Sequence, residues 1–257
     1  MTLYWITLAT ALSLAEPVWA QEQAQPAATE AEADKKVEVS GVKNPALRPY
    51  RIMTRGLDAF DQHHALAPKA DLRFELWNAD GTIPQACSLG LRLAGDKFSQ
   101  SLPVDSEATF ILPRSQAALD DNADLVLNRK KDQMQWRPRV RSPGVPDNAR
   151  RMGDMRLECE VAWAVMKDQM AFLVRTAMAA AGGMCRAPMT ALHYRTARPL
   201  ASATLVSGER SRVLTLGTDR STYIVPLRSK EWDDESLIVY RYADETAAPK
   251  EQGAAAP

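Results

Sequence analysis

The sequence predicts an α+β fold, in which β-strands and a few helices occupy separate parts of the chain. Short runs of alternating apolar side chains fill residues 71–140 and 200–242, and turn residues separate them, as in antiparallel sheets. Before and between these segments, apolar residues recur at steps of three and four, the spacing of a helix face. We therefore expect an N-terminal amphipathic helix and a central helix or helical hairpin near 154–183.

The N-terminal helix is predicted over residues 50–64. Its apolar face consists of residues three or four positions apart, namely Tyr50, Met53, Leu57, Phe60 and His64. Pro49 suits the first turn, because its ring fixes a helical φ angle. Pro68 then leads out of the helix towards the first β segment.

The first β segment begins with alternation at Leu72, Phe74 and Leu76, followed by a turn signal at residues 78–81. Further strands are expected in four runs. These are 87–93, where Cys87, Leu89, Leu91 and Leu93 share a face, and then 97–102, 107–112 and 123–128. Residues 137–149 contain three prolines, which cannot donate hydrogen bonds to a sheet. They predict a surface loop or a strand at a sheet edge.

The central segment is predicted to be helical. Asp154 can cap its start, and Gly182-Gly183 can end it. A stripe at helical spacing is formed by Trp163, Met166, Met170, Leu173 and Ala177. Residues 155–165 also alternate as a strand would, so a strand is the competing interpretation. The Ala- and Met-rich composition up to Ala181 favours the helix.

The cysteines constrain this helix. A straight helix from 159 to 181 is about 33 Å long, and Cα atoms more than about 7 Å apart cannot be bridged by a disulfide. A Cys159–Cys185 disulfide therefore requires a break, which we place at Lys167-Asp168, with Asp168 capping a second helix. We favour this pair, and Cys87–Cys159, which needs no break, stays open.

The second β segment follows Pro199. Four runs are expected as strands, 201–206, 212–216, 222–227 and 236–242. The two β segments can join in one sheet system, since chain ends often meet.

The ends of the chain predict export. Residues 1–20 contain an apolar run from Leu3 to Ala15 and small residues before a cut between Ala20 and Gln21, the layout of a signal peptide. The run is too short for a membrane span of about 20 residues. The missing positive charge ahead of it leaves an uncleaved anchor open. We expect a periplasmic or secreted protein with no membrane span in the mature chain.

The domain plan follows from composition. Residues 21–40 and 246–257 lack the apolar content needed for a core and are predicted to be a disordered linker and a disordered tail. Residues 41–245 are expected to form a single globular domain. A split near 145–153 into two sub-domains is the alternative.

Charge and motifs exclude several function classes. Removing residues 1–20 removes Glu16 and no base, so 32 basic and 31 acidic residues leave a net charge of +1. We therefore expect no nucleic-acid partner. The sequence has neither GxxxxGK[ST] nor GxGxxG, and no cofactor is expected. His63 and His64 are adjacent, so on a helix they point about 100° apart and do not chelate one ion. No metal site is expected.

A hydrolase is the alternative function. It would use His193, or His63 and His64, with a serine or cysteine, and Cys185 with His193 is one such pair. No Gly-x-Ser-x-Gly motif supports it.

The most distinctive polar feature is a concentration of arginines within twenty residues. They are Arg137, Arg139, Arg141, Arg150, Arg151 and Arg156. Alternation places the first three on one side of an extended chain, and guanidinium groups pair well with carboxylate or phosphate. We expect a non-catalytic, envelope-associated binding or structural protein whose arginines at 137, 139, 141, 150 and 151 meet an anionic envelope component or partner protein. Internal pairing with nearby acids is the alternative.

Overall fold

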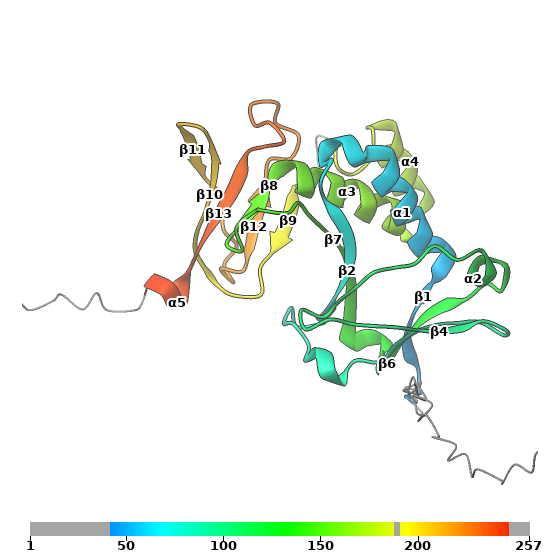
Figure 1. Ribbon diagram of the computed structural model, residues 1–257. Helices are drawn as coiled ribbons and strands as arrows, with labels where there is room; N and C mark the ends of the chain where they lie inside the picture. The colour runs from blue at the N-terminus through cyan, green and yellow to red at the C-terminus, as the bar shows by residue number, and fades with distance from the viewer. Residues whose placement is uncertain (1–41, 188–190, 247–257) are drawn as a thin grey trace, which may run out of the picture. The chain divides into compact units, whose positions relative to one another are not determined.

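The computed structural model describes residues 42–187 and 191–246, all within one compact unit, Val37–Pro257 (Figure 1). These residues confirm the α+β fold, with several antiparallel sheets and a few helices. The predicted signal peptide and linker lie outside the described residues, as does the tail after Thr246. Within the described ranges, no helix has the length and apolar character needed to cross a membrane.

The first half of the chain is mostly strand. In order, its elements are β1 (Pro45–Pro49), α1 (Tyr50–His63), β2 (Asp71–Asn78), β3 (Leu91–Ala94), β4 (Ser99–Leu102), β5 (Thr109–Phe110), α2 (Gln116–Asp120), β6 (Asp124–Lys130), β7 (Met134–Arg141) and β8 (Ala149–Arg151). The second half continues with α3 (Met152–Met166), α4 (Phe172–Ala180), β9 (Leu192–Arg195), β10 (Leu200–Ser207), β11 (Arg210–Val213), β12 (Thr222–Val225), β13 (Leu237–Tyr242) and α5 (Ala243–Thr246). The N-terminal helix therefore forms where the apolar spacing predicts it.

The strands form four antiparallel sheets. Their strand orders are β1-β6-β3-β4, β5-β2-β7, β11-β10-β13-β8 and β12-β9. The two β segments do not join in one sheet in the described chain, since no strand of 71–140 pairs with a strand of 200–242. Only β8, which lies between the segments in sequence, pairs with β13.

Two large apolar clusters form most of the core, and a small third cluster joins Ala67, Ala70, Val140 and Leu157. The first packs Tyr50 and Met53 of α1 against Phe74 and Leu76 of β2 and against β3 and β6. The second is built from β10, β12 and β13 and includes the disulfide cysteines. In sequence, almost all of the first cluster precedes Val140 and all of the second follows Arg151.

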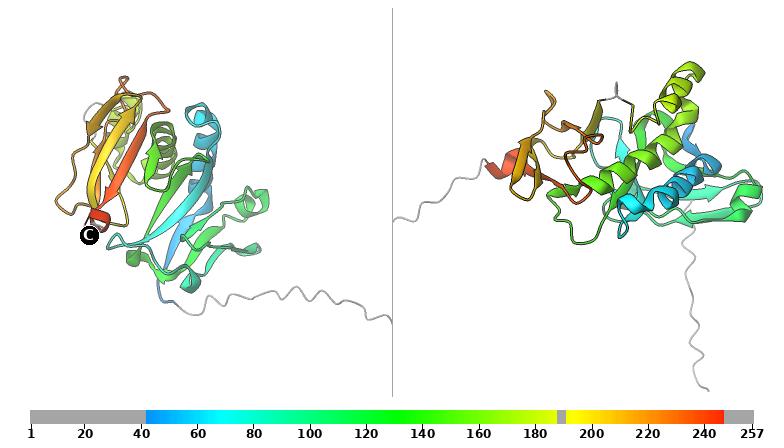
Figure 2. Two further views of the ribbon diagram at one scale, coloured as in Figure 1. Left: turned by 60° about the vertical axis from the view of Figure 1, so that its left-hand side comes forward. Right: turned by 90° about the horizontal axis from the view of Figure 1, so that it is seen from above.

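Helix α3 belongs to both clusters. Its Val161 packs in the first, whereas Met152, Met155 and Cys159 pack in the second. On its other sides, α1 runs along it and β7 packs against it (Figures 1 and 2). A helix that is covered all round has no single apolar face. This burial explains why residues 155–165 also fit a strand pattern, although they are helical.

The central helix breaks where the disulfide requires it. Residues Lys167–Gln169 form a 3-10 turn between α3 and α4. Asp168 does not cap α4, whose N-cap position is Ala171, and it binds Arg55 and Arg175 instead. The predicted apolar stripe is therefore interrupted, because α4 does not continue the line of α3, and Leu173 is 78% exposed.

The cysteine pairing is confirmed. Cys159 and Cys185 form a disulfide with their Cα atoms 5.8 Å apart. Cys87 is a free, exposed cysteine. It lies in a 3-10 turn, Ala86–Ser88, so the strand predicted from 87 begins only at Leu91.

Candidate functional site

The β2–β7 pair presents the first three arginines of the sequence. Register places Arg137 opposite Glu75, Arg139 opposite Arg73, and Arg141 opposite Asp71. Residues at alternate positions of a strand share one face, so the three arginines lie on the same side of β7, as their spacing predicts.

Carboxylates of α3 cover the free edge of β7. The Val140 N–H donates to Glu158 Oε2 at 3.0 Å, and the Ser142 N–H donates to Asp154 Oδ2 at 2.8 Å. Two strand residues span about 6.6 Å and four helix residues about 6 Å, so the two spacings match. Pro138 has the same parity as Val140, and its missing N–H leaves no donor unpaired at this edge. Asp154, predicted to cap the helix, therefore binds strand β7 instead.

Arg150 of β8 contacts both Glu158 of α3 and Val140 of β7. Its Nη2 donates to Glu158 Oε2 at 2.7 Å and to the Val140 carbonyl oxygen at 3.3 Å. Burial, the largest single influence, lowers the pKa of Arg150, but the Glu158 carboxylate together with Tyr240 and Tyr223 outweighs it, and the pKa is raised above its ordinary value. The pair is a buried, hydrogen-bonded ion pair that joins β7, β8 and α3.

A cleft of about 430 Å³ opens beside this ion pair. Strands β2 and β7 line one side, β9 and β12 line the other, and α3 contributes Glu158, Cys159, Ala162 and Met166. Its charged residues come from β2, β7, β8, α3 and β9, namely Glu75, Arg137, Arg150, Glu158 and Arg195. Clefts between two packing units are common sites for small ligands.

Arg137 is the cation of this cleft that has no carboxylate partner within 4 Å in the described chain. Its guanidinium carbon lies 4.5 Å from the centroid of the Trp77 ring, and Nη2 donates to Gln135 Oε1 at 2.5 Å. Burial lowers its pKa, and Glu75 opposes that shift. Stacking and one hydrogen bond hold the guanidinium while its other donors remain for a ligand.

Arg195 closes the cleft from β9. Its Nη2 lies 3.3 Å from Asp219 Oδ2, and its guanidinium packs against Gly81 in the turn after β2. A Cβ on Gly81 would lie 2.7 Å from Arg195 Cζ, and the φ angle of Gly81 is +86°. Glycine is therefore required here by backbone conformation and by the approach of Arg195.

Glu75 is a carboxyl of the cleft whose pKa is raised. Burial, followed by the charge of Glu158, raises its pKa to about 7, and Arg150 and Arg139 oppose the rise. The carboxyl is therefore partly protonated near neutral pH, and it can donate or accept a hydrogen bond there.

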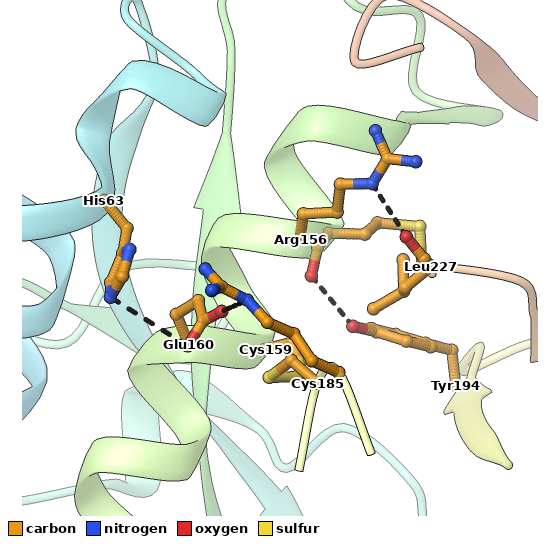
Figure 3. The surroundings of a disulfide bond; sticks show 9 residues. His63, Arg156, Cys159, Glu160, Cys185, Tyr194 and Leu227 are labelled. Carbon is orange, nitrogen blue, oxygen red and sulfur yellow. Dashed lines mark hydrogen bonds and ion pairs between the residues drawn. A yellow bond between two sulfur atoms is a disulfide. The ribbon is translucent and has the colours of Figure 1, made fainter. Parts of the chain in front are cut away.

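The disulfide forms part of the wall of the cleft. Cys159 lines the cleft, whereas Cys185 lines a second pocket of about 590 Å³ on its other side. Figure 3 shows Tyr194 reaching α3 from β9, where its hydroxyl donates to the Met155 carbonyl oxygen at 3.0 Å. Tyr194 therefore holds β9 against helix α3, and the disulfide holds Cys185 against it.

The remaining predicted arginines have partners within the protein. Arg139 pairs with Glu107, and Arg141 donates to the carbonyl oxygens of Val145 and Pro146 at 3.0 and 2.8 Å. Arg151 pairs with Glu235, and Arg156 with Asp234. The cleft brings together only Arg137 and Arg150 of the predicted arginines, along with His193.

The histidines and Cys185 do not assemble into one site. Cys185 is disulfide-bonded, so the predicted Cys185–His193 pair has no thiol to act as nucleophile. His63 Nε2 lies 3.9 Å from Glu160 Oε2 (Figure 3), whereas the ring of His64 contacts the ring of Phe60 in a tilted arrangement. In the parts of the chain that are described, no three His, Cys, Asp or Glu side chains are grouped to hold a metal ion.

Sequence reasoning missed Glu75, Glu158 and Arg195. Glu75 occupies a polar position in an alternating strand, which usually faces water, and Glu158 lies in a helix with charged neighbours. No local pattern marks them, because the cleft joins residues from positions 75 to 222. No family model matches this chain, and comparisons with curated proteins and with solved structures find no match either.

Proposed function

We propose that this chain is an exported, non-catalytic binding protein and that its cleft holds a ligand with an acidic group. The observation that carries the proposal is Arg137, a cation held on Trp77 in the cleft without a carboxylate partner within 4 Å in the described chain. Arginine binds carboxylate and phosphate through two parallel hydrogen bonds, which gives orientation as well as affinity.

The size and charge of the cleft support this function. Its volume of about 430 Å³ falls within the roughly 300–1,000 Å³ that is typical of small-molecule sites. Its lining has three arginines and two glutamates, a net charge of +1 when both glutamates are ionised. A small anion is therefore favoured over a cation.

Export rests on two observations. Residues 1–20 have the layout of a signal peptide, and the Cys159–Cys185 disulfide suits an oxidising compartment. An envelope component or solute outside the cytoplasm is therefore the expected ligand, in the periplasm or in the medium.

Native mass spectrometry tests this function. The purified full-length protein is incubated with an envelope extract of the cells that produce it, and bound masses are compared for the wild type, Arg137→Gln and Arg212→Gln. Arg212 is an exposed arginine of β11, outside the cleft, so its variant controls for the loss of one charge. We expect a retained anionic species that Arg137→Gln loses and Arg212→Gln keeps. Equal retention by both variants would refute the proposal.

A hydrolase or other acid–base enzyme is the second candidate. The raised pKa of Glu75, about 7, is the observation that favours it, since a general acid or base works best with a pKa near the working pH. The same extract experiment separates the two functions. An enzyme would yield a product mass over time that Glu75→Gln abolishes, whereas a binding protein would retain its ligand unchanged.

A further inference from the structure

The lining of the cleft changes from charged to apolar residues along helix α3. Glu158, with Arg150 beside it, lies at one end, and Ala162 and Met166 follow one and two turns further along the helix. Eight helical residues span about 12 Å. The charged and the apolar parts of the lining are therefore separated by a distance comparable with the length of a small organic ligand.

The apolar part is built from flexible side chains. Besides Met166, it includes Met184, in the loop that the Cys185 disulfide holds against α3, and Leu192 of β9. Methionine side chains adapt to irregular apolar shapes. The side chains of Met166, Met184 and Leu192 carry no charge, so their surfaces suit a hydrocarbon or an aromatic body.

We propose that the ligand of the cleft is an amphiphilic monoanion, with one acidic head group and an apolar body, such as a medium-chain carboxylate. The head group binds Arg137, and the apolar body lies along Ala162 and Met166. This inference rests on the proposed binding function and specifies the chemistry of the ligand.

The number of unpaired cations in the lining limits the ligand to one negative charge. Arg150 pairs with Glu158 and Arg195 pairs with Asp219, so Arg137 is the one arginine of the lining that has no ion-pair partner within the described chain. Glu75 stands directly opposite Arg137 in the β2–β7 register. An ionised Glu75 therefore competes with the ligand for the same guanidinium, and a polyanion would leave charge without a partner.

Isothermal titration calorimetry on the full-length protein tests this chemistry with three probes. Octanoate has the head and the body, acetate has only the head, and 1-octanol has only the body. We expect octanoate to bind at least tenfold more tightly than either of the others, since each part adds its own contacts. Acetate binding as tightly as octanoate would overturn the inference but leave anion binding intact. Failure of octanoate to bind at all would also overturn it.

Variants separate the two ends of the cleft. Arg137→Gln should weaken octanoate by about 10- to 100-fold, the effect of losing a charge-assisted hydrogen bond, and leave 1-octanol unchanged. Arg137→Lys, which keeps the charge, should fall between the two, so a general loss of folding cannot explain the series. Met166→Ser should weaken octanoate but not acetate, and Arg212→Gln should change neither. Equal losses for octanoate and 1-octanol in Arg137→Gln would contradict the assignment of the head group.

The pH dependence gives an independent readout. Octanoate binding should weaken as the pH rises from 6 to 8, because Glu75 loses its proton there and its charge opposes the ligand. Glu75→Gln should show a smaller dependence of octanoate affinity on pH than the wild type, since His193, which also lines the cleft, is present in both proteins. The same pH dependence in Glu75→Gln as in the wild type would overturn the role of Glu75.

Discussion

At the scale of single residues, Glu75 is a carboxyl placed where ionisation is unfavourable. The folded chain raises its pKa from 4.5 to about 7. Between these values the folded protein binds more protons than the unfolded chain, so its stability falls as the pH rises through this window. At 1.36 kcal/mol per pKa unit, the full effect is on the order of 3 kcal/mol. Keeping a titratable carboxyl inside the cleft therefore lowers the stability of the folded protein once Glu75 is ionised.

Replacing Glu75 by Gln should remove this pH dependence. We expect Glu75→Gln to be more stable than the wild type at pH 8 by about 1–3 kcal/mol, since the amide carries no charge to desolvate. The advantage should shrink towards pH 4.5. Urea denaturation at pH 5 and pH 8 measures the stability difference between Glu75→Gln and the wild type at each pH. Exposed Glu209→Gln is the control. An unchanged difference between the two pH values in Glu75→Gln would refute the prediction.

Gly81 allows a separate test of how Arg195 is positioned. Gly81→Ala should destabilise the fold by about 1–2 kcal/mol through its positive φ angle, and by a further amount because the Cβ would meet Arg195. Gly208→Ala is the matched control, because Gly208 also has a positive φ angle but has no atom within 4 Å of a built Cβ. Urea denaturation should show the larger loss for Gly81→Ala, and Arg195→Ala should reduce that excess. Equal losses in the two glycine variants would contradict the contact.

At the scale of elements, side chains of α3 accept hydrogen bonds at the edge of β7, where a neighbouring strand would usually accept them. Edge strands have unpaired N–H and C=O groups that can pair with another chain. Here Asp154 and Glu158 of α3 accept hydrogen bonds from Ser142 and Val140 at the edge of β7. Helix side chains therefore accept the hydrogen bonds that a further strand would otherwise accept at this edge of β7.

The disulfide should stabilise the segment that contains α4. It closes a loop of 26 residues, for which the loss of unfolded-chain entropy corresponds to about 3.5 kcal/mol. The described α4 buries none of its residues, so little besides the covalent bond holds it. The double variant Cys159→Ser with Cys185→Ser should lose about 2–4 kcal/mol in urea denaturation, and the amides of α4 should exchange faster. Cys87→Ser is the control and should change neither measurement.

At the scale of the whole molecule, the described chain has two large apolar clusters, and helix α3 contributes residues to both. Val161 packs in the first cluster, and Met152, Met155 and Cys159 pack in the second. Unfolding either cluster would expose one side of α3 and break its contacts with the other. The sub-domains that the sequence leaves open near residues 145–153 are therefore expected to be coupled.

The two clusters should unfold together. Native-state hydrogen exchange should give the same opening free energy for amides of β2, in the first cluster, and of β10 and β13, in the second. Val161→Ala should lower both values equally, although it removes contacts only from the first. If β10 kept its protection while β2 lost it, the clusters would be independent sub-domains.

The sequence by itself determined the features that depend on neighbouring residues. Helix α1, most strands and the turn before Gly81 follow from apolar spacing and turn residues, and chain geometry required the break at Lys167-Asp168 for the confirmed disulfide. In α3 the apolar spacing fitted both a helix and a strand. The reason is that α3 packs against several elements, so its apolar residues do not gather on a single face.

Tertiary structure alone decided the cleft and the partners of the arginines. The cleft unites Glu75, Arg137, Glu158 and Arg195, which are up to 120 residues apart, and none of them forms a pattern with its neighbours. The predicted arginine group was divided in the same way, since Arg139, Arg151 and Arg156 meet acids that folding brings near. The physical reason is one of range, because local spacing fixes which face a side chain lies on, whereas only packing fixes what that face meets.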